Sequence, residues 1–150
     1  MIDKGRIPKE LLAIFEDKLQ GRSEGISVPP PVFDTMKGEF VNYSVEKNVL
    51  VNRFPILTEH LNPYGNMQGG IVSAAIDNTI GPLSMLVSAP NFTRNMEVKY
   101  GKVISPDLEY IYVIAKFIEK KKRQLFFEAT VEDKDGNKLA TAKSVHWVID

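Results

Sequence analysis

The 150-residue sequence contains no cysteine, and it has only two histidines, His60 and His146, far apart in the chain. The absence of cysteine excludes a disulfide framework and any metal site built on paired cysteines, and it is typical of a reducing compartment. Two distant histidines do not predict a histidine-rich metal site. We therefore expect a fold held together by its apolar core, with no resident metal or redox cofactor.

An excess of charge of either sign is also missing, because 19 basic residues balance 19 acidic ones. No overall field would attract nucleic acid or an anionic membrane. The first 22 residues carry scattered charges and lack the apolar core of a secretory signal. The most apolar region, residues 69–89, contains Asp77 and Pro82, which argues against a membrane span. We expect a soluble, cytoplasmic protein with no nucleic-acid or membrane partner.

Phosphate-binding and zinc motifs are absent as well: no GxGxxG, GxxxxGK or HExxH pattern occurs. At the N-terminus, Pro8 suits a first helical turn, and Gly21 is placed to stop the helix. The apolar positions between them share one broad face: Leu11, Leu12, Phe15 and Leu19. The prolines at 29–31 predict an extended connector. We expect residues 1–37 to pack on a domain formed by residues 38–150.

From residue 39 the apolar period changes to two. Residues 39–46 alternate Val41, Tyr43 and Val45 with polar neighbours, and a turn at 47–48 leads to a second strand at 49–54. Four further strands follow the apolar segment: 94–103, 108–119, 124–133 and 138–149. Turns compatible with hairpins predict an antiparallel sheet, and the long apolar helix must bury itself against one face of that sheet. The predicted fold class is α+β, with one long central helix wrapped by about six strands.

A glycine pair, Gly69 and Gly70, opens the central helix. The first amides of a helix have no intrahelical acceptor and lie at the positive end of its dipole. Glycines at this position would let a ligand approach those amides, which suits a developing oxyanion. Tight loop packing is the alternative explanation of the pair.

Asp77 is the second unusual feature of the helix, because an unpaired carboxylate is costly to bury. It is either a structural carboxylate, bonded to Ser73 or to a neighbouring strand, or a reactive one. Asp77 lies eight residues after Gly69, about 12 Å along one helix, so one helix cannot bring both to one reacting group. Two antiparallel copies related by a two-fold axis could do so, which predicts at least a homodimer.

The string HLNPYGNMQGGIVSAAIDNTIGP resembles the signature of hotdog-fold acyl-CoA thioesterases, in the phenylacetate-pathway-like branch related to 4-hydroxybenzoyl-CoA thioesterases. That pattern is N-x-x-G-x-x-H-G-G with an acid seven residues after the second glycine. The sequence matches it at Asn62, Gly65, Gly69, Gly70 and Asp77. The element order of residues 38–149 also resembles the hotdog fold.

The resemblance implies specific roles. Asp77 would act as general base or nucleophile on the thioester, and the Gly69 amide would polarise its carbonyl, with Gly70 shaping the turn. Asn62 would orient the substrate or the hydrolytic water. Thr93 falls where relatives often carry a hydroxyl residue near that water, although an ordinary strand position explains it too.

The sequence departs from the pattern at Gln68, where this branch commonly has histidine. Glutamine can still form hydrogen bonds but cannot carry a proton at neutral pH. His60 could contribute to substrate binding in its place, or be an incidental loop residue. The basic run at 119–124 offers Lys121, Lys122 and Arg123 to the phosphates of coenzyme A, or forms a solvated hairpin tip.

The function expected from these features is hydrolysis of an acyl-CoA to a free acid and coenzyme A, by a homodimer or homotetramer, with coenzyme A present only as part of the substrate. One alternative is a non-catalytic acyl-CoA or acyl-carrier binding protein, which the departure at Gln68 motivates. A hotdog hydratase or dehydratase is less consistent with the sequence, since such enzymes pair a histidine with the acid and residues 61–145 contain none.

Overall fold

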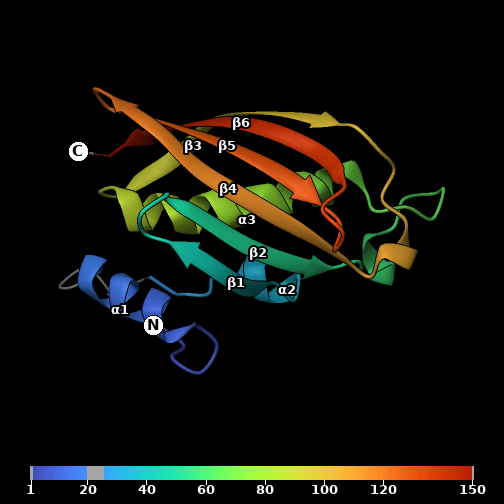
Figure 1. Cartoon of the computed structure of the whole chain (residues 1–150), viewed down its shortest axis with the longest axis horizontal. Coiled ribbons are helices and arrows are strands. Elements are labelled where there is room, and N and C mark those ends of the chain that lie inside the picture. Colours follow the sequence, from blue (N-terminus) through green and yellow to red (C-terminus); the bar gives the residue numbers. More distant parts are fainter. Residues whose placement is uncertain (1, 20–25, 150) are drawn as a thin grey trace.

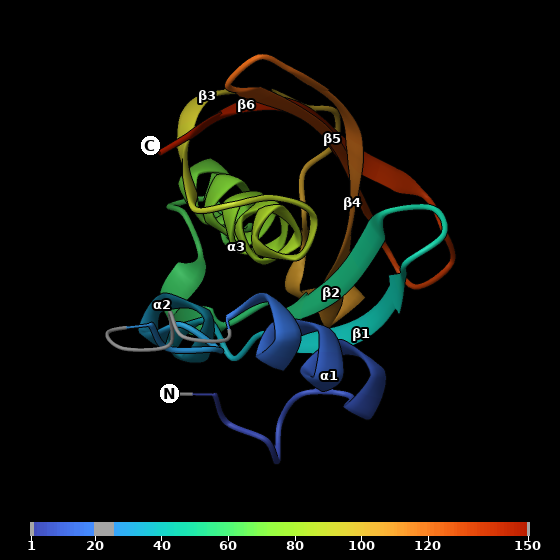
Figure 2. The same cartoon turned by 90° about the vertical axis from the view of Figure 1, so that its left-hand side faces the viewer.

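The computed structural model of the chain describes residues 2–19 and 26–149. A single antiparallel sheet curls around one long helix, α3, which spans Gly69–Val87 (Figure 1, Figure 2). The strands are β1 (Glu39–Ser44), β2 (Val49–Pro55), β3 (Asn91–Tyr100), β4 (Tyr110–Lys121), β5 (Gln124–Glu132) and β6 (Lys138–Val148). This confirms the expected α+β architecture. The predicted stop of the first helix at Gly21 lies outside the described residues.

The strand order is β1-β2-β4-β5-β6-β3, so β3 does not pair with the strand that follows it in the chain. The chain leaves β2 through the short helix η1 (Thr58–His60), runs along α3, and returns as an edge strand beside β6. It then crosses to β4 through η2 (Pro106–Leu108). The register of β3 on β6 aligns Thr93 with His146, which brings a segment just after α3 against the last strand.

Helix α3 (Gly69–Val87) forms the centre of the core. Its length and apolar composition alone would suit a membrane crossing, but here half of its most apolar 18-residue window is buried inside the protein. The sheet covers α3 on two sides in Figure 2, with α1 (Lys9–Lys18) and α2 (Pro31–Thr35) below. One face of α3 remains partly exposed and carries mostly small residues: Gly70, Ser73, Ala74, Asp77 and Gly81.

Pro82 lies inside α3 and cannot donate a hydrogen bond to the carbonyl of Asn78, four residues earlier. A completely buried side chain on β2 supplies the missing donor. The Asn52 Nδ2 amide lies 3.2 Å from the Asn78 carbonyl and 3.2 Å from Thr79 Oγ1. Asn52 therefore supplies the hydrogen bond that Pro82 cannot give to the Asn78 carbonyl, and it links α3 to β2.

Replacing Asn52 by leucine is expected to lower the free energy of unfolding by about 1–3 kcal/mol, because the Asn78 carbonyl would remain buried without a donor. Urea denaturation of the two proteins measures the difference. In a Pro82→Ala background the alanine N–H can serve that carbonyl, so the same substitution should cost less. Equal costs in both backgrounds would show that Asn52 does not compensate for Pro82.

The N-terminal segment packs against this core. Helix α1 (Lys9–Lys18) buries Leu11 and Phe15, and Phe15 meets the ring of Phe40 on β1 at 6.2 Å between centroids. The expectation of an extended proline connector was wrong in part. Pro30 is extended, but Pro31 begins the short helix α2 (Pro31–Thr35), because proline is well suited to the first position of a helix.

Strand β1 differs from the predicted alternation. The register of β1 on β2 shifts between Phe40 and Asn42. Phe40 before the bulge and Tyr43 after it both pack against the core, whereas Val41 within the bulge is 45% exposed. Val45 is 64% exposed because it lies in the turn that follows β1. The extra residue at the bulge lets Phe40 and Tyr43, three positions apart, face the same side of the sheet.

Candidate active site

Four of the residues predicted from the sequence line two separate hollows. The hollow at the start of α3 has a volume of about 290 Å³ and is lined by Asn62, Gly69 and Tyr100, among others. The second lies further along α3, has a volume of about 250 Å³, and is lined by Asp77, Thr93 and His146, among others. The wall of the second hollow includes Phe15 of α1 and Pro30, so the N-terminal segment helps to enclose the aspartate.

The helix-start hollow presents backbone donors. Gln68 is the N-cap of α3, and its carbonyl accepts from the amides of Ile71 and Val72. Among the described residues the amides of Gly69 and Gly70 have no acceptor, as expected of the first turn of a helix. A Cβ at Gly69 would lie 3.4 Å from the Tyr100 ring, whereas one at Gly70 would meet nothing within 4 Å.

Asn62 organises the loop that leads into this helix. Its side-chain Oδ1 accepts from the amides of Tyr64, at 2.9 Å, and Asn66, at 3.1 Å. Gly65 adopts a φ of +79°, which glycine allows without strain. The side-chain Oδ1 of Asn62 thus stabilises the loop. The predicted role of Asn62 toward a substrate or water stays a prediction.

Gln68 and His60 join the same loop through their backbones. The Gln68 amide donates to the His60 carbonyl at 2.9 Å, while the exposed side chain of Gln68 forms no capping hydrogen bond to the helix. The backbone N–H of Gln68, and not its side-chain amide, therefore fixes the loop to the helix start. Substrate binding by either side chain stays a prediction.

Asp77 bonds to the neighbouring strand and not to Ser73. The Thr93 hydroxyl on β3 donates to Asp77 Oδ1 at 2.9 Å, whereas Ser73 Oγ lies 2.5 Å from the Tyr100 hydroxyl. Asp77 is half-buried, and it remains at the wall of the hollow. The structure therefore brings two predicted residues, Asp77 and Thr93, into direct contact.

His146 was given no role at the site from the sequence, because a histidine partner of the acid was sought within residues 61–145. It is 2% exposed, and its Nε2 lies 3.4 Å from Thr93 Oγ1, while its Nδ1 lies 2.8 Å from Asn91 Oδ1. Burial lowers the pKa of His146 from its usual value, and the nearby Asp77 carboxylate opposes that shift. The period-two pattern of β6 could have predicted an inward-facing ring, but not its neighbours.

Solved structures resemble this arrangement over most of its length, although no family model and no curated protein matches the sequence. A putative thioesterase from Ralstonia eutropha, described as phenylacetic acid degradation-related, superimposes with a TM-score of 0.75 at 21% identity, covering 90% of this chain and 99% of its own. The chain has the hotdog fold. The hotdog protein PaaI from the E. coli phenylacetic acid degradation operon matches with a TM-score of 0.75 at 9% identity, over 93% and 96% of the two chains.

A third hotdog structure, from Streptococcus mutans, was solved bound to acetyl-CoA. It matches with a TM-score of 0.68 at 18% identity, covering 75% of this chain and 88% of its own. At such identities the likeness establishes the fold, while the chemistry has to be argued from the residues of this chain.

The basic run of this hotdog chain forms the tip of the β4–β5 hairpin. Lys121 pairs with Glu119 at 3.3 Å, Lys122 occupies the turn with a φ of 55°, and Arg123 donates to the Val148 carbonyl at 3.2 Å. The register that aligns Gln124 with Trp147 places this tip at the end of the sheet where His146 lies. Contact with coenzyme A phosphates stays a prediction.

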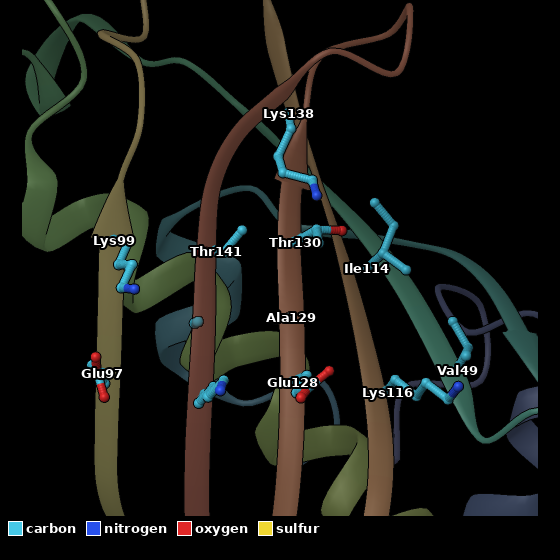
Figure 3. Close-up of a pocket in the computed structure, with 12 residues that line it drawn as sticks. Val49, Glu97, Lys99, Ile114, Lys116, Glu128, Ala129, Thr130, Lys138 and Thr141 are labelled. Atoms are coloured by element: carbon cyan, nitrogen blue, oxygen red, sulfur yellow. The ribbon is translucent and has the colours of Figure 1, made fainter.

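A groove of about 440 Å³ crosses the outer face of the hotdog sheet, and its side chains rise from five neighbouring strands (Figure 3). It contains none of the predicted site residues. Its charges alternate across the strands in register, in the order Glu97, Lys143, Glu128 and Lys116. Opposite charges on facing strands stabilise the pairing, which accounts for this row without a ligand.

Within residues 2–19 and 26–149, no group of three or more histidine, aspartate or glutamate side chains is arranged to hold a metal ion. The groups available at the two hollows are therefore backbone amides, a carboxylate, hydroxyls and a buried imidazole. Such a set can bind a carbonyl oxygen and accept a proton from water.

Proposed function

We propose that the protein is an acyl-CoA thioesterase that hydrolyses a thioester to a free acid and coenzyme A. The observation that carries the proposal is Asp77, which lies in a hollow with the Thr93 hydroxyl on one oxygen, on the same helix whose unsatisfied first amides open the other hollow. The hotdog structures described as thioesterase, or bound to acetyl-CoA, support this substrate class.

In this mechanism the Gly69 amide donates to the thioester carbonyl oxygen and stabilises the negative charge that develops there. Asp77 either takes a proton from the attacking water or attacks the carbonyl carbon itself. The carbon–sulfur bond breaks, the thiolate of coenzyme A leaves and is protonated, and water supplies the new oxygen of the acid. Thr93 would hold the carboxylate in place for either route.

The two hollows lie along different parts of α3, one at its start and one from its middle onward, so we propose that the complete site forms between two copies of the chain. Gly69 and Asp77 are about 12 Å apart along α3, too far to act on one carbonyl. The small-residue face of α3 is partly exposed, and β3 is an edge strand beside it. An antiparallel pair of these helices would place Asp77 of each chain opposite Gly69 of its partner.

Gly81 allows a direct test of that interface. A Cβ there would meet nothing within 4 Å of the single chain, so Gly81→Arg should fold but should prevent close approach of a second α3. Light scattering with size-exclusion chromatography is expected to give twice the 16.9 kDa chain mass, or a multiple of that, for the wild type and a single chain mass for the variant.

The matched control is Glu46→Arg, an exposed position in the β1–β2 turn, which should leave the oligomer unchanged. An active wild-type protein that is purely monomeric would contradict the shared site. A dimer that survives Gly81→Arg would place the interface on another face of the molecule.

The substrate class is tested with short, medium and long aliphatic acyl-CoA thioesters, phenylacetyl-CoA and benzoyl-CoA, assayed for released thiol. Hydrolysis of at least one of them, lost in Asp77→Ala, is the expected result. The exposed Gln68, in place of the histidine of the related pattern, favours one alternative, a non-catalytic acyl-CoA binding protein. Tight binding across the panel without hydrolysis would establish that alternative and overturn the enzyme.

A further inference from the structure

His146 is a buried titratable group that the proposed mechanism does not use. It lies on β6, directly opposite Thr93 in the register with β3, and its ring packs against Phe127 at 5.0 Å between centroids. A lone histidine in a core usually has an apolar environment or a fixed structural partner. Here one ring nitrogen faces a hydroxyl that is itself bonded to the proposed reactive carboxylate.

The proton positions in this chain of groups follow from the partners of Asn91. Its Nδ2 lies 3.0 Å from the Ala89 carbonyl and 3.4 Å from the Ser84 carbonyl. Both partners are acceptors, so the amide nitrogen must face them and Oδ1 must face the ring. The His146 Nδ1, 2.8 Å from that oxygen, therefore carries a proton.

The other ring nitrogen, Nε2, then decides what the Thr93 hydroxyl can do. That hydroxyl has one hydrogen and two candidate acceptors, Asp77 Oδ1 at 2.9 Å and the Nε2 lone pair at 3.4 Å. When the ring is neutral, the hydroxyl can donate its hydrogen bond to either acceptor. When Nε2 is protonated, it donates a hydrogen bond to the Thr93 oxygen, and the hydroxyl can then donate only to Asp77.

We propose that His146 is a positioning residue for Asp77 that acts through Thr93: the protonation state of the buried ring decides whether the Thr93 hydrogen is reserved for the carboxylate. A neutral ring allows Asp77 Oδ1 to accept a proton from water. A charged ring keeps the Thr93 hydroxyl hydrogen-bonded to that oxygen and adds a nearby positive charge. Both effects weaken the carboxylate as a base. The proposal rests on Asp77 being the reactive carboxylate of the proposed function.

The surroundings of the ring make Asp77 its principal electrostatic partner. Among the described residues, Asp77 on α3 is the charged side chain that acts on His146. The other elements around the ring present uncharged side chains: Asn91 and Thr93 on β3, Leu125 and Phe127 on β5, and Phe15 of α1 across the hollow. Burial lowers the proton affinity of the ring, and this carboxylate raises it.

An NMR titration tests the coupling without any assay of turnover. The chain has two histidines, so the ring signals of His146 and His60 are assigned by comparison with His60→Gln. The His146 midpoint is expected below the usual value for histidine. It should fall further in Asp77→Asn, which removes the charge, and in Thr93→Val, which removes the hydroxyl, while Thr93→Ser should restore it.

A His146 midpoint that is the same in Thr93→Val and Thr93→Ser, or unmoved by Asp77→Asn, would overturn the proposal. A ring that carries its neutral-state proton on Nε2 would also overturn it, since that tautomer contradicts the assigned chain of donors. His60 lies at the other end of the domain, so its midpoint should not respond to these substitutions.

The activity test is the pH dependence of kcat with the acyl-CoA found in the substrate panel. Wild-type kcat should fall as the pH falls through the His146 midpoint measured by NMR. This step should be missing in His146→Gln and retained in His60→Gln. KM should change little in His146→Gln, because the ring is 2% exposed and acts on Asp77 through Thr93.

A step that persists in His146→Gln would overturn the positioning role even if the NMR midpoints respond. The two proposals fail in different ways. No hydrolysis of any acyl-CoA removes the proposed function, while the titration still reports whether the ring and the carboxylate are coupled. Hydrolysis without any effect of His146 on the NMR midpoints or on the pH dependence of kcat would support the proposed thioesterase and overturn the further inference.

Discussion

Replacing Asp77 by asparagine or alanine is expected to lower kcat for acyl-CoA hydrolysis by about 10²–10⁴-fold, the usual contribution of a positioned base or nucleophile. Asparagine keeps the size of the side chain and an oxygen that can accept from Thr93, so the local structure should survive. Only the ability to take a proton or attack a carbonyl is lost. Released thiol and circular dichroism measure activity and folding on the same samples.

Glu97→Gln is the matched control for Asp77→Asn. Glu97 is also a carboxylate close to α3 in sequence, but it lies on β3 facing the outer groove of the sheet (Figure 3). Its neutralisation should leave kcat unchanged. Hydrolysis at the wild-type rate by Asp77→Ala would remove the aspartate from the mechanism, and an equal loss in Glu97→Gln would show that the effect is not specific to the hollow.

Replacing Gly69 by proline is expected to reduce kcat by about 10²–10³-fold, the cost of one lost donor to an oxyanion. The structure makes this substitution unusually clean. Gly69 is the first residue of α3, where proline is favoured, and Gln68 before it has an extended backbone, which a following proline requires. The variant should fold while lacking the one N–H that the mechanism assigns to the thioester carbonyl.

Gly69→Ala separates the amide from the bulk of the side chain. Its Cβ would stand 3.4 Å from the Tyr100 ring, much as the proline ring would, but the N–H is retained. We expect it to keep most of the activity that Gly69→Pro loses. If both variants lose activity equally, crowding against Tyr100 is the cause, and the Gly69 amide is not the donor.

Residues close together in the chain could be interpreted from their order alone. The period-two strands, the glycine pair that opens the long helix, and the placement of Asp77 two turns into that helix all follow from local patterns. They were sufficient to predict six strands wrapped around one central helix, and the resemblance of the helix-start motif to a thioesterase signature added the expectation of a hotdog fold. The same local reasoning went wrong at three positions: at Val41, which a bulge in β1 leaves exposed, at Val45, which lies in the turn after that strand, and at Pro31, which begins a helix.

The contacts around Asp77 depended on the tertiary structure. Hairpin logic pairs neighbouring strands, but the crossover along α3 carries β3 to the far edge of the sheet, beside β6. That pairing brings Thr93 to His146, and the packing of β3 beside α3 brings Thr93 to Asp77. Residues 53 positions apart share no local pattern, because their contact is set by burial of the whole sheet around α3.

The sequence by itself determined which groups are available: a carboxylate on a small-residue helix face, bare amides at its start, and no cysteine. Only the tertiary structure decided how they are distributed, with Asp77 and Gly69 in separate hollows and a buried histidine behind Thr93. The physical reason is that local propensity depends on neighbours in the chain. The hydrogen bonds that link Asn91, His146, Thr93 and Asp77 span 2.8–3.4 Å. They join three elements that only the assembled core brings together.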